Sequence, residues 1–123
     1  MSEHFLLTYT VSNVGPQSQK HKSDDVRDEI RDLDFDKVID LGRDFHGPFH
    51  NWDKLSLVET TIKGHIIVEG RYNDDKQKSA TKAVSKIFIH ILKKHEASAR
   101  TTVIHCAMLV NDAGDTFEFD VKY

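Results

Sequence analysis

The order in which two kinds of hydrophobic pattern follow each other restricts the fold of this chain more than any other feature. Patterns typical of strands recur in five segments: 4–12, 36–41, 55–72, 101–110 and 116–122. A helical period of about 3.6 residues instead marks residues 23–34 and 74–97. The sequence therefore predicts two helices set among five strands.

This order of elements predicts an α+β fold of the ferredoxin-like type, β-α-β-β-α-β with an additional C-terminal strand. The alternative is an unrelated α+β sandwich with the same elements. The chain has 123 residues, no internal repeat and no change in composition along its length. We therefore expect a single domain over residues 1–123.

Local signals set the expected boundaries. Ser23 is expected to be the N-cap of the first helix, because a serine hydroxyl accepts a hydrogen bond from the first turn. Residues 55–72 fit either a hairpin that turns at Lys63-Gly64 or one long strand. We expect the long strand, bent at Gly64, because it keeps the apolar residues on one face. Residues 42–53 contain two glycines and a proline, which favours an aromatic loop.

The charged residues sum to a net charge of −3 with neutral histidines. This excludes a chain that is basic over its whole surface, but it does not exclude a local basic patch. The lack of a long apolar run and of a basic leader predicts a cytoplasmic protein with no membrane contact. There is no Walker-type loop, GxSxG motif or dinucleotide fingerprint, so classical nucleotide-binding, hydrolase and Rossmann functions are not supported. No cofactor and no metal are expected.

The single cysteine, Cys106, excludes an internal disulfide. It follows His105 in an apolar strand, and adjacent residues of a strand point to opposite faces. The two residues are therefore not a Cys–His catalytic pair, and Cys106 is expected to be a buried, unreactive thiol.

A basic stripe is predicted along the second helix, at four-residue spacing: Lys78, Lys82, Lys86, His90 and Lys94. Such a line of cations can follow a phosphate backbone, so these residues are the predicted nucleic-acid-binding site. The alternative is that the stripe faces the acidic first helix. The acids of that helix are Asp24, Asp25, Asp28, Glu29 and Asp32.

Residues 42–53 hold the predicted catalytic residues Arg43, His46 and His50. Metal-independent RNA cleavage needs a base for the 2′-hydroxyl proton, an acid for the leaving oxygen and a cation for the phosphorane charge. Two histidines and an arginine provide that chemistry. Two alternatives stay open. One is a metal site of His46, His50 and Asp53, and the other is a structural loop whose aromatic rings cap the sheet.

Several segments resemble a known family. The opening strand HFLLTYTVS, the run LDFDKVIDLG, the aromatic Gly-Pro loop and the segment LSLVETTI together cover residues 4–62. In this order they resemble small bacterial ferredoxin-like endoribonucleases, in particular the GhoS-like antitoxins of type V toxin–antitoxin systems. The resemblance implies a compact homodimer that binds or cuts RNA, which in the antitoxins is the messenger of the toxin.

That family is structurally related to the small nuclease-like subunit of CRISPR adaptation complexes, which holds a metal with an aspartate at the end of its first strand. The matching stretch here, YTVSN, has no acid, which speaks against metal-dependent cleavage of that type. Two hypotheses follow. The first is an RNA-binding protein that acts as a metal-independent endoribonuclease on single-stranded RNA. The second is a non-enzymatic protein-binding module, such as a regulator or a defence-system inhibitor. We favour the first.

A homodimer is also expected on physical grounds. Residues 101–110 are apolar on both faces, yet two helices can cover only one face of a sheet. We expect the uncovered face to meet a second copy of the chain, with residues 116–122 contributing by pairing across the dimer.

Overall fold

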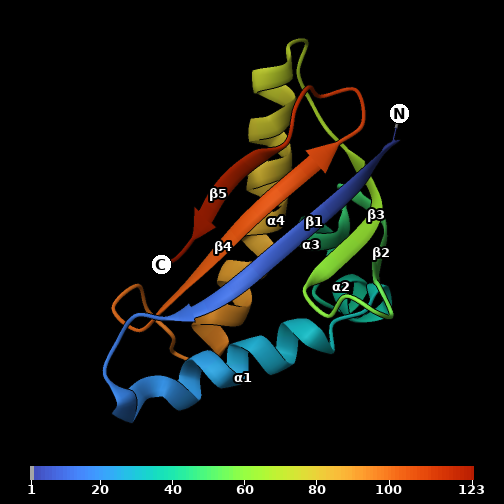
Figure 1. The fold of residues 1–123 in the computed structure, drawn as a ribbon. Coiled ribbons are helices and arrows are strands. Elements are labelled where there is room, and N and C mark those ends of the chain that lie inside the picture. Colours follow the sequence, from blue (N-terminus) through green and yellow to red (C-terminus); the bar gives the residue numbers. More distant parts are fainter. Residues whose placement is uncertain (1) are drawn as a thin grey trace.

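Five antiparallel strands form one sheet in the computed structural model, which describes residues 2–123 (Figure 1). In their order across the sheet they are β2 (Phe49–Lys54), β3 (Thr61–Ile67), β1 (Ser2–Asn13), β4 (Thr102–Val110) and β5 (Phe117–Val121). The long strand β1 lies at the centre, where it pairs with β3 on one side and β4 on the other. The described residues thus form an α+β fold with a five-stranded antiparallel sheet and four α-helices.

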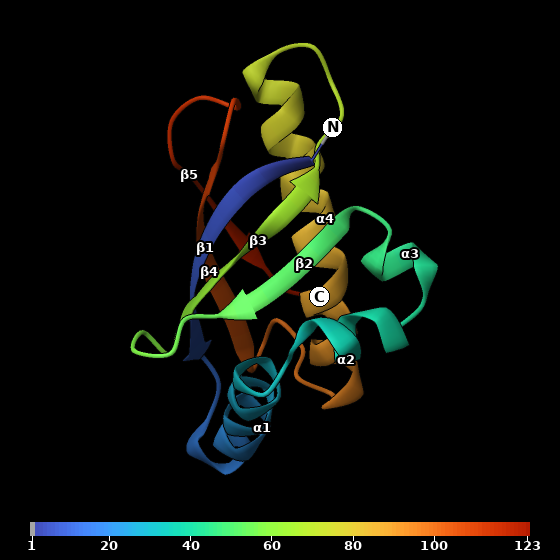
Figure 2. The same cartoon turned by 90° about the vertical axis from the view of Figure 1, so that its right-hand side faces the viewer.

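The helices lie on one side of the sheet or below its end, and they leave the other face open (Figures 1 and 2). They are α1 (Lys20–Arg31), α2 (Phe35–Asp40), α3 (Arg43–His46) and α4 (Asn73–Lys94), with a short 3₁₀ turn η1 (Gln17–Gln19) before α1. The long helix α4 runs behind the sheet in the view of Figure 1, whereas α2 and α3 lie on the side of β2 (Figure 2).

The core lies between the sheet and α4. On β1, every second side chain from Phe5 to Val11 is buried, and the residues between them are exposed. The ring of Phe88 on α4 packs edge-on against Tyr9 and Trp52, with ring centroids 5.8 and 6.1 Å away. The helix predicted over 74–97 is present as α4. It buries its whole apolar stripe: Ala80, Ala83, Val84, Ile87, Phe88, Ile91 and Leu92.

Cys106 lies in β4 with its side chain in the core, and the next residue towards the N-terminus, His105, is exposed on the opposite face. Burial, with a smaller contribution from the Asp120 carboxylate, raises the pKa of the Cys106 thiol to about 12. At neutral pH the thiol is therefore protonated and a poor nucleophile. The prediction of a buried thiol that forms no pair with His105 is confirmed.

The first helix begins earlier than predicted, because α1 starts at Lys20 and Ser23 lies within it. The prediction of Ser23 as N-cap is therefore wrong. Its side chain is buried, and its hydroxyl lies 2.7 Å from the hydroxyl of Thr102. Serine is a common N-cap, but here the hydroxyl of Ser23 connects α1 to the start of β4 through this contact.

The strand predicted over 36–41 is also wrong, because these residues form helix α2. The Asp34 side chain accepts a hydrogen bond of 2.9 Å from the backbone N–H of Lys37, which is the usual contact of an N-cap. Only Val38 of this helix is buried. The two β-branched residues Val38 and Ile39 favoured a strand, but the cap and the single buried contact favour one and a half helical turns.

The structure also corrects the prediction for residues 42–72. The segment predicted as a loop contains α3 and strand β2, and β3 spans only residues 61–67. Residues 55–60 connect the two strands, so the expected long strand over 55–72 is wrong. The alternative hairpin with its turn at Lys63-Gly64 is wrong too, because both residues lie within β3. The alternation typical of a strand is absent from β2, because its two buried residues, Phe49 and Trp52, are three positions apart. The pairing with β3 shifts by one residue between Phe49 and Asn51, which explains this spacing.

Gly64 is required by a close approach and not by a bend. It pairs with Phe5 of β1 on one side and with Trp52 of β2 on the other. A Cβ atom at this position would lie 2.7 Å from the Phe5 ring and would also meet the carbonyl oxygen of Asn51. The backbone oxygen cannot move without breaking the β2–β3 pairing, so only glycine fits here.

We predict that Gly64→Ala destabilises the fold by about 2–3 kcal/mol, because the added methyl group overpacks a closed part of the sheet. The midpoint of urea unfolding should fall by about 1–2 M. Lys63→Ala is the matched control, because Lys63 is the exposed neighbour on the same strand. Its effect should stay within about 0.5 kcal/mol. Equal midpoints for Gly64→Ala and the wild type would contradict the close approach.

Candidate functional site

The α3 segment rests on α4 through the side chain of Phe45. The ring centroid of Phe45 lies 5.1 Å from that of His90, and Nζ of Lys86 lies 5.6 Å from the Phe45 ring. The backbone carbonyl of Gly42 accepts hydrogen bonds from the N–H groups of Phe45 and His46, which fixes the turn of α3. The segment with the predicted catalytic residues therefore adjoins the predicted basic stripe. We call the combined area the α3–α4 surface; it comprises Arg43, Phe45, His46, Lys78, Lys82, Lys86 and His90.

Three lysines of the stripe are open to solvent. Lys78, Lys82 and Lys86 are exposed, and within residues 2–123 no ion pair involves any of them. They lie one helical turn apart, so each step along α4 is about 6 Å. These lysines present a row of positive charge on the outer side of α4, with carboxylates nearby but none within ion-pair distance in the described residues.

The far end of the stripe has a different environment. Lys94 Nζ lies 3.0 Å from Oε1 of Glu29 on α1, and His95 Nε2 lies 2.8 Å from the same oxygen. Burial alone would raise the pKa of Glu29, but the hydrogen bonds from Lys94 and His95 outweigh it and lower the pKa overall. The contact with the acidic first helix, weighed above as the alternative, therefore involves Lys94 and not the three lysines nearer the start of α4.

A hollow of about 470 Å³ lies between α3, the end of β3 and α4. Lys82 and Lys86 line it, together with Asp44, Glu69 and Ser79. The Ser79 hydroxyl accepts a hydrogen bond of 2.9 Å from the backbone N–H of Glu69. The hollow thus offers cations for a phosphate and carboxylates for hydrogen-bond donors, a combination that suits a nucleotide.

The structure places the predicted catalytic residues on two neighbouring elements. Arg43 begins α3 and is exposed, His46 ends α3 and is half-buried, and His50 is exposed on β2. No hydrogen bond or ion pair joins any two of these three side chains within the described residues 2–123. Over the same residues, no three His, Cys, Asp or Glu side chains are placed to share a metal ion, so His46, His50 and Asp53 do not form such a group.

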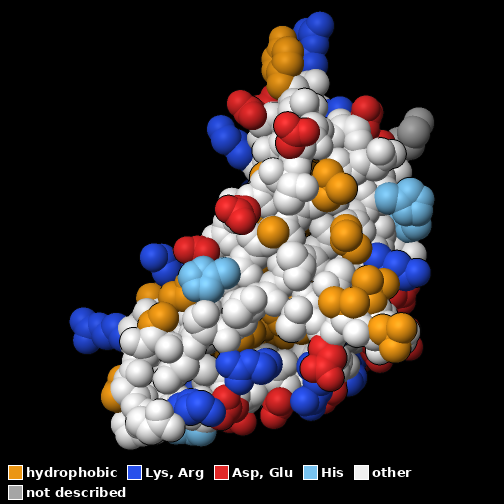
Figure 3. Space-filling model, viewed as in Figure 1, with side chains coloured by type: hydrophobic (Ala, Val, Ile, Leu, Met, Phe, Trp, Pro, Cys, Tyr) orange, Lys and Arg blue, Asp and Glu red, His pale blue; other side chains and the backbone are white. Residues whose placement is uncertain are grey.

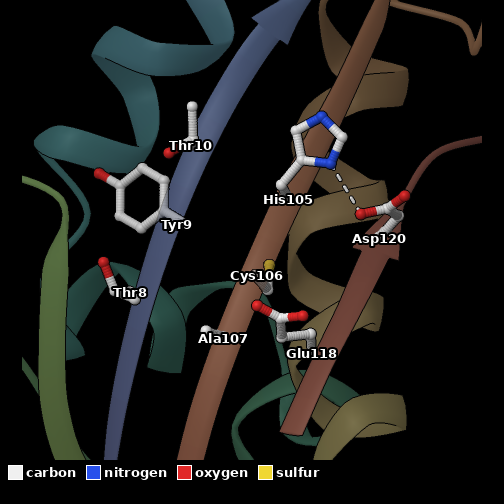
Figure 4. A pocket seen from close by; sticks show the side chains of 8 residues that line it. All are labelled: Thr8, Tyr9, Thr10, His105, Cys106, Ala107, Glu118 and Asp120. Carbon is white, nitrogen blue, oxygen red and sulfur yellow. Dashed lines mark hydrogen bonds and ion pairs between the residues drawn. The ribbon is translucent and has the colours of Figure 1, made fainter.

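A second hollow, of about 290 Å³, lies on the open face of the sheet across β1, β4 and β5 (Figure 4). Its polar lining comprises Thr8, Thr10, His105, Glu118 and Asp120. Nδ1 of His105 lies 2.7 Å from Oδ1 of Asp120, which orients the imidazole ring. Such a pair can accept a proton from a ligand, but the two carboxylates beside it repel a phosphate.

The pairing of His105 with Asp120 was not predicted from the sequence, although a signal for it was present. The turn at residues 111–114 lies between the two last strands. A hairpin centred on that turn places His105 opposite Asp120, which is the register that the structure has. The period of two alone could not reveal the pair, because it does not say which residues face each other.

No protein-family model, curated protein or solved structure matches this chain. The resemblance of residues 4–62 to type V antitoxins therefore stays an expectation, and the function has to be argued from the geometry of the surface. In residues 2–123, none of the helices has both the length and the hydropathy that a membrane span requires.

Proposed function

We propose that the chain binds single-stranded RNA on the α3–α4 surface. The observation that carries this proposal is the packing of Phe45 against Lys86 and His90, which joins the basic stripe to the segment of Arg43 and His46. Three exposed lysines at steps of about 6 Å suit a short stretch of phosphates. The adjoining hollow can receive one nucleotide between the backbone contacts.

The open face of the sheet is less suited to nucleic acid. Proteins that bind single strands on a sheet stack the bases on exposed aromatic rings. The outward positions of β1, β4 and β5 carry leucines, threonines, two acids and the histidines His4 and His105, with no Phe, Tyr or Trp among them. This contrast supports the helix side as the RNA-binding side.

We also propose that the fold is of the ferredoxin-like type. Two features support this: α1 lies in the connection from β1 to β2, and α4 lies in the connection from β3 to β4. The antiparallel neighbours β2-β3-β1-β4 are consistent with it. On this proposal β5, α2 and α3 are additions, and α3 is the one that brings functional side chains to α4.

Lys82→Glu combined with Lys86→Glu should lower the affinity for a single-stranded RNA at least tenfold. It should also flatten the dependence of log K on log salt by about 0.7 for each lost phosphate contact. Both side chains are exposed, so the fold should persist. Fluorescence anisotropy at several salt concentrations measures both quantities.

A matched control has the same change in charge on other elements. Lys63 on β3 and Lys122 after β5 are both exposed, and Lys63→Glu with Lys122→Glu should leave most of the affinity intact. If both double variants bind RNA equally well, the α3–α4 surface is not the binding site.

We propose further that the bound RNA is cut without a metal, with His46 and His50 as acid and base and Arg43 as the cation. His46→Ala and His50→Ala should each lower the cleavage rate by about 10²–10⁴ and leave RNA affinity nearly unchanged. The products should carry 2′,3′-cyclic phosphates, and EDTA should have no effect. Gel analysis of a labelled oligonucleotide gives the rates and the product ends.

His21→Ala is the control for this pair, because His21 is an exposed histidine on α1. It should cleave at the wild-type rate. Loss of cleavage in EDTA, or full activity in both histidine variants, would remove this assignment. If the wild type cleaves nothing, the chain binds RNA without cutting it.

A second candidate function is protein binding through the open face, beginning with a second copy of the chain. Leu6 of β1 and Leu109 of β4 lie directly opposite each other on that face and are 45% and 44% exposed. Figure 3 shows hydrophobic side chains among charged groups over this face. Apolar neighbours exposed in register on rigid strands are typical of an interface between chains.

We predict that the wild type scatters light with twice the monomer mass at micromolar concentration. Leu6→Asp with Leu109→Asp should reduce that mass to the monomer value, because the two new charges would meet their own copies. Leu57→Asp is the control, because Leu57 is 94% exposed in the β2–β3 connection and not on the open face. A monomeric wild type would rule out the dimer and leave a different protein as the partner.

A further inference from the structure

The strand β5 leaves one edge of the sheet unpaired. It is the last strand in the order across the sheet, and Figure 1 shows it at the margin with no further described strand beyond it. The other edge strand, β2, has α2 and α3 on its side (Figure 2). An edge strand presents backbone N–H and C=O groups that can pair with another extended segment. The edge of β5 is therefore the place where the sheet can be extended.

The register shows which backbone groups of β5 point outwards. Directly after β4, the N–H of Asn111 donates a hydrogen bond of 2.8 Å to the carbonyl oxygen of His4 on β1. Backbone groups point alternately to the two neighbours of a strand, so the odd-numbered residues of β4 bond to β1 and the even-numbered residues bond to β5. The partners of these even-numbered residues are Phe117, Phe119 and Val121. The backbone groups of Glu118 and Asp120 therefore point away from the sheet.

The same two residues place carboxylates on the open face. Figure 4 shows Glu118 and Asp120 on β5, with Asp120 joined to His105 of β4. No ion pair involves Glu118 within residues 2–123. Two copies of β5 that pair antiparallel over the whole strand would place Glu118 opposite the second copy's Asp120, and like charges directly opposite each other destabilise a sheet. A second copy is therefore a poor occupant of this edge.

The helix-side face of β5 is apolar and incompletely covered. The rings of Phe117 and Phe119 stack there with centroids 6.1 Å apart, and both side chains are only half-buried. A hollow of about 360 Å³ lies between Phe117 and α4, and its lining includes Lys78 and Lys82. An apolar side chain on this side would cover the two rings, whereas a cation would meet the two lysines.

From these features we propose that β5 binds an extended segment of another protein, with lysine or arginine on one face and apolar residues on the other. The basic side chains lie opposite Glu118 and Asp120 on the open face. The apolar side chains lie beside Phe117 and Phe119 on the helix side. Because cations are favoured on one face and opposed on the other, a shift of the segment by one residue is unfavourable. The proposal does not rest on RNA binding by the α3–α4 surface.

A test of the backbone pairing uses the capped peptide Val-Lys-Val-Lys-Val, which matches the five residues of β5 in length. In the proposed pairing, the lysines exchange their backbone hydrogen bonds with Glu118 and Asp120. N-methylation of the two lysine amides should therefore lower the affinity at least about tenfold, whereas N-methylation of two valine amides should leave it unchanged. The two modified peptides have the same charge, so charge attraction alone does not distinguish them. An NMR titration of the labelled chain gives the affinities, and the largest shift changes should fall on β5.

The variant Glu118→Lys tests the contribution of the side chains. Glu118 is exposed, so the fold should persist. The affinity for Val-Lys-Val-Lys-Val should fall at least about tenfold, and the variant should instead prefer Val-Glu-Val-Glu-Val. Asp53→Lys is the matched control, because it makes the same change in charge at an exposed acid of β2, the other edge strand. It should bind both peptides as the wild type does.

Equal affinities of the two N-methylated peptides, or wild-type affinity in Glu118→Lys, would overturn the proposal. A wild type that binds none of the peptides would overturn it as well. Light scattering tests the second copy as the occupant. Glu118→Pro removes an N–H that points outwards, a change that an edge strand tolerates. A wild-type dimer that dissociates in Glu118→Pro would show a second copy at this edge, against the proposal.

Discussion

The packing of α4 against the inner face of the central strands holds the whole fold together. Phe88 contacts Tyr9 and Trp52, which brings β1 and β2 onto the same helix. Because α4 buries one stripe, its opposite side remains available to solvent and to Phe45. The same packing leaves the second face of the sheet uncovered. Two surfaces of different chemistry follow from this one contact, a basic one on the helix side and a mixed apolar and acidic one on the sheet side.

Much of the fold could be predicted from the sequence where a pattern is long. α4, β1 and β4 each have a periodic stripe over nine or more residues, and the structure has them close to the predicted bounds. The failures are short elements that depend on contacts far away in sequence. Ser23 is of a residue type that often caps helices, but its hydroxyl contacts the hydroxyl of Thr102. Residues 36–41 have a pattern typical of a strand, but they follow an N-cap at Asp34 and form a helix. The intrinsic preference of six residues for helix or strand is weak, so contacts with distant residues determine which structure forms.

For the candidate site, too, some features could be predicted from the sequence and others could not. The spacing of Lys78, Lys82 and Lys86 follows from the helix alone, and the sequence was sufficient to place them in a row. The contact of Lys94 with Glu29 was foreseeable only as one of two alternatives. The contact of His105 with Asp120 depends on strand register, which a period of two does not determine.

We propose that RNA binds the helix side of the molecule and not the open sheet. The most direct measurement is an amide chemical-shift titration of the labelled chain with a short single-stranded RNA. We expect the largest chemical-shift changes on α4 between Lys78 and Lys86 and on α3 between Arg43 and His46. Changes concentrated on the outward residues of β1, β4 and β5, with α3 and α4 unaffected, would contradict it.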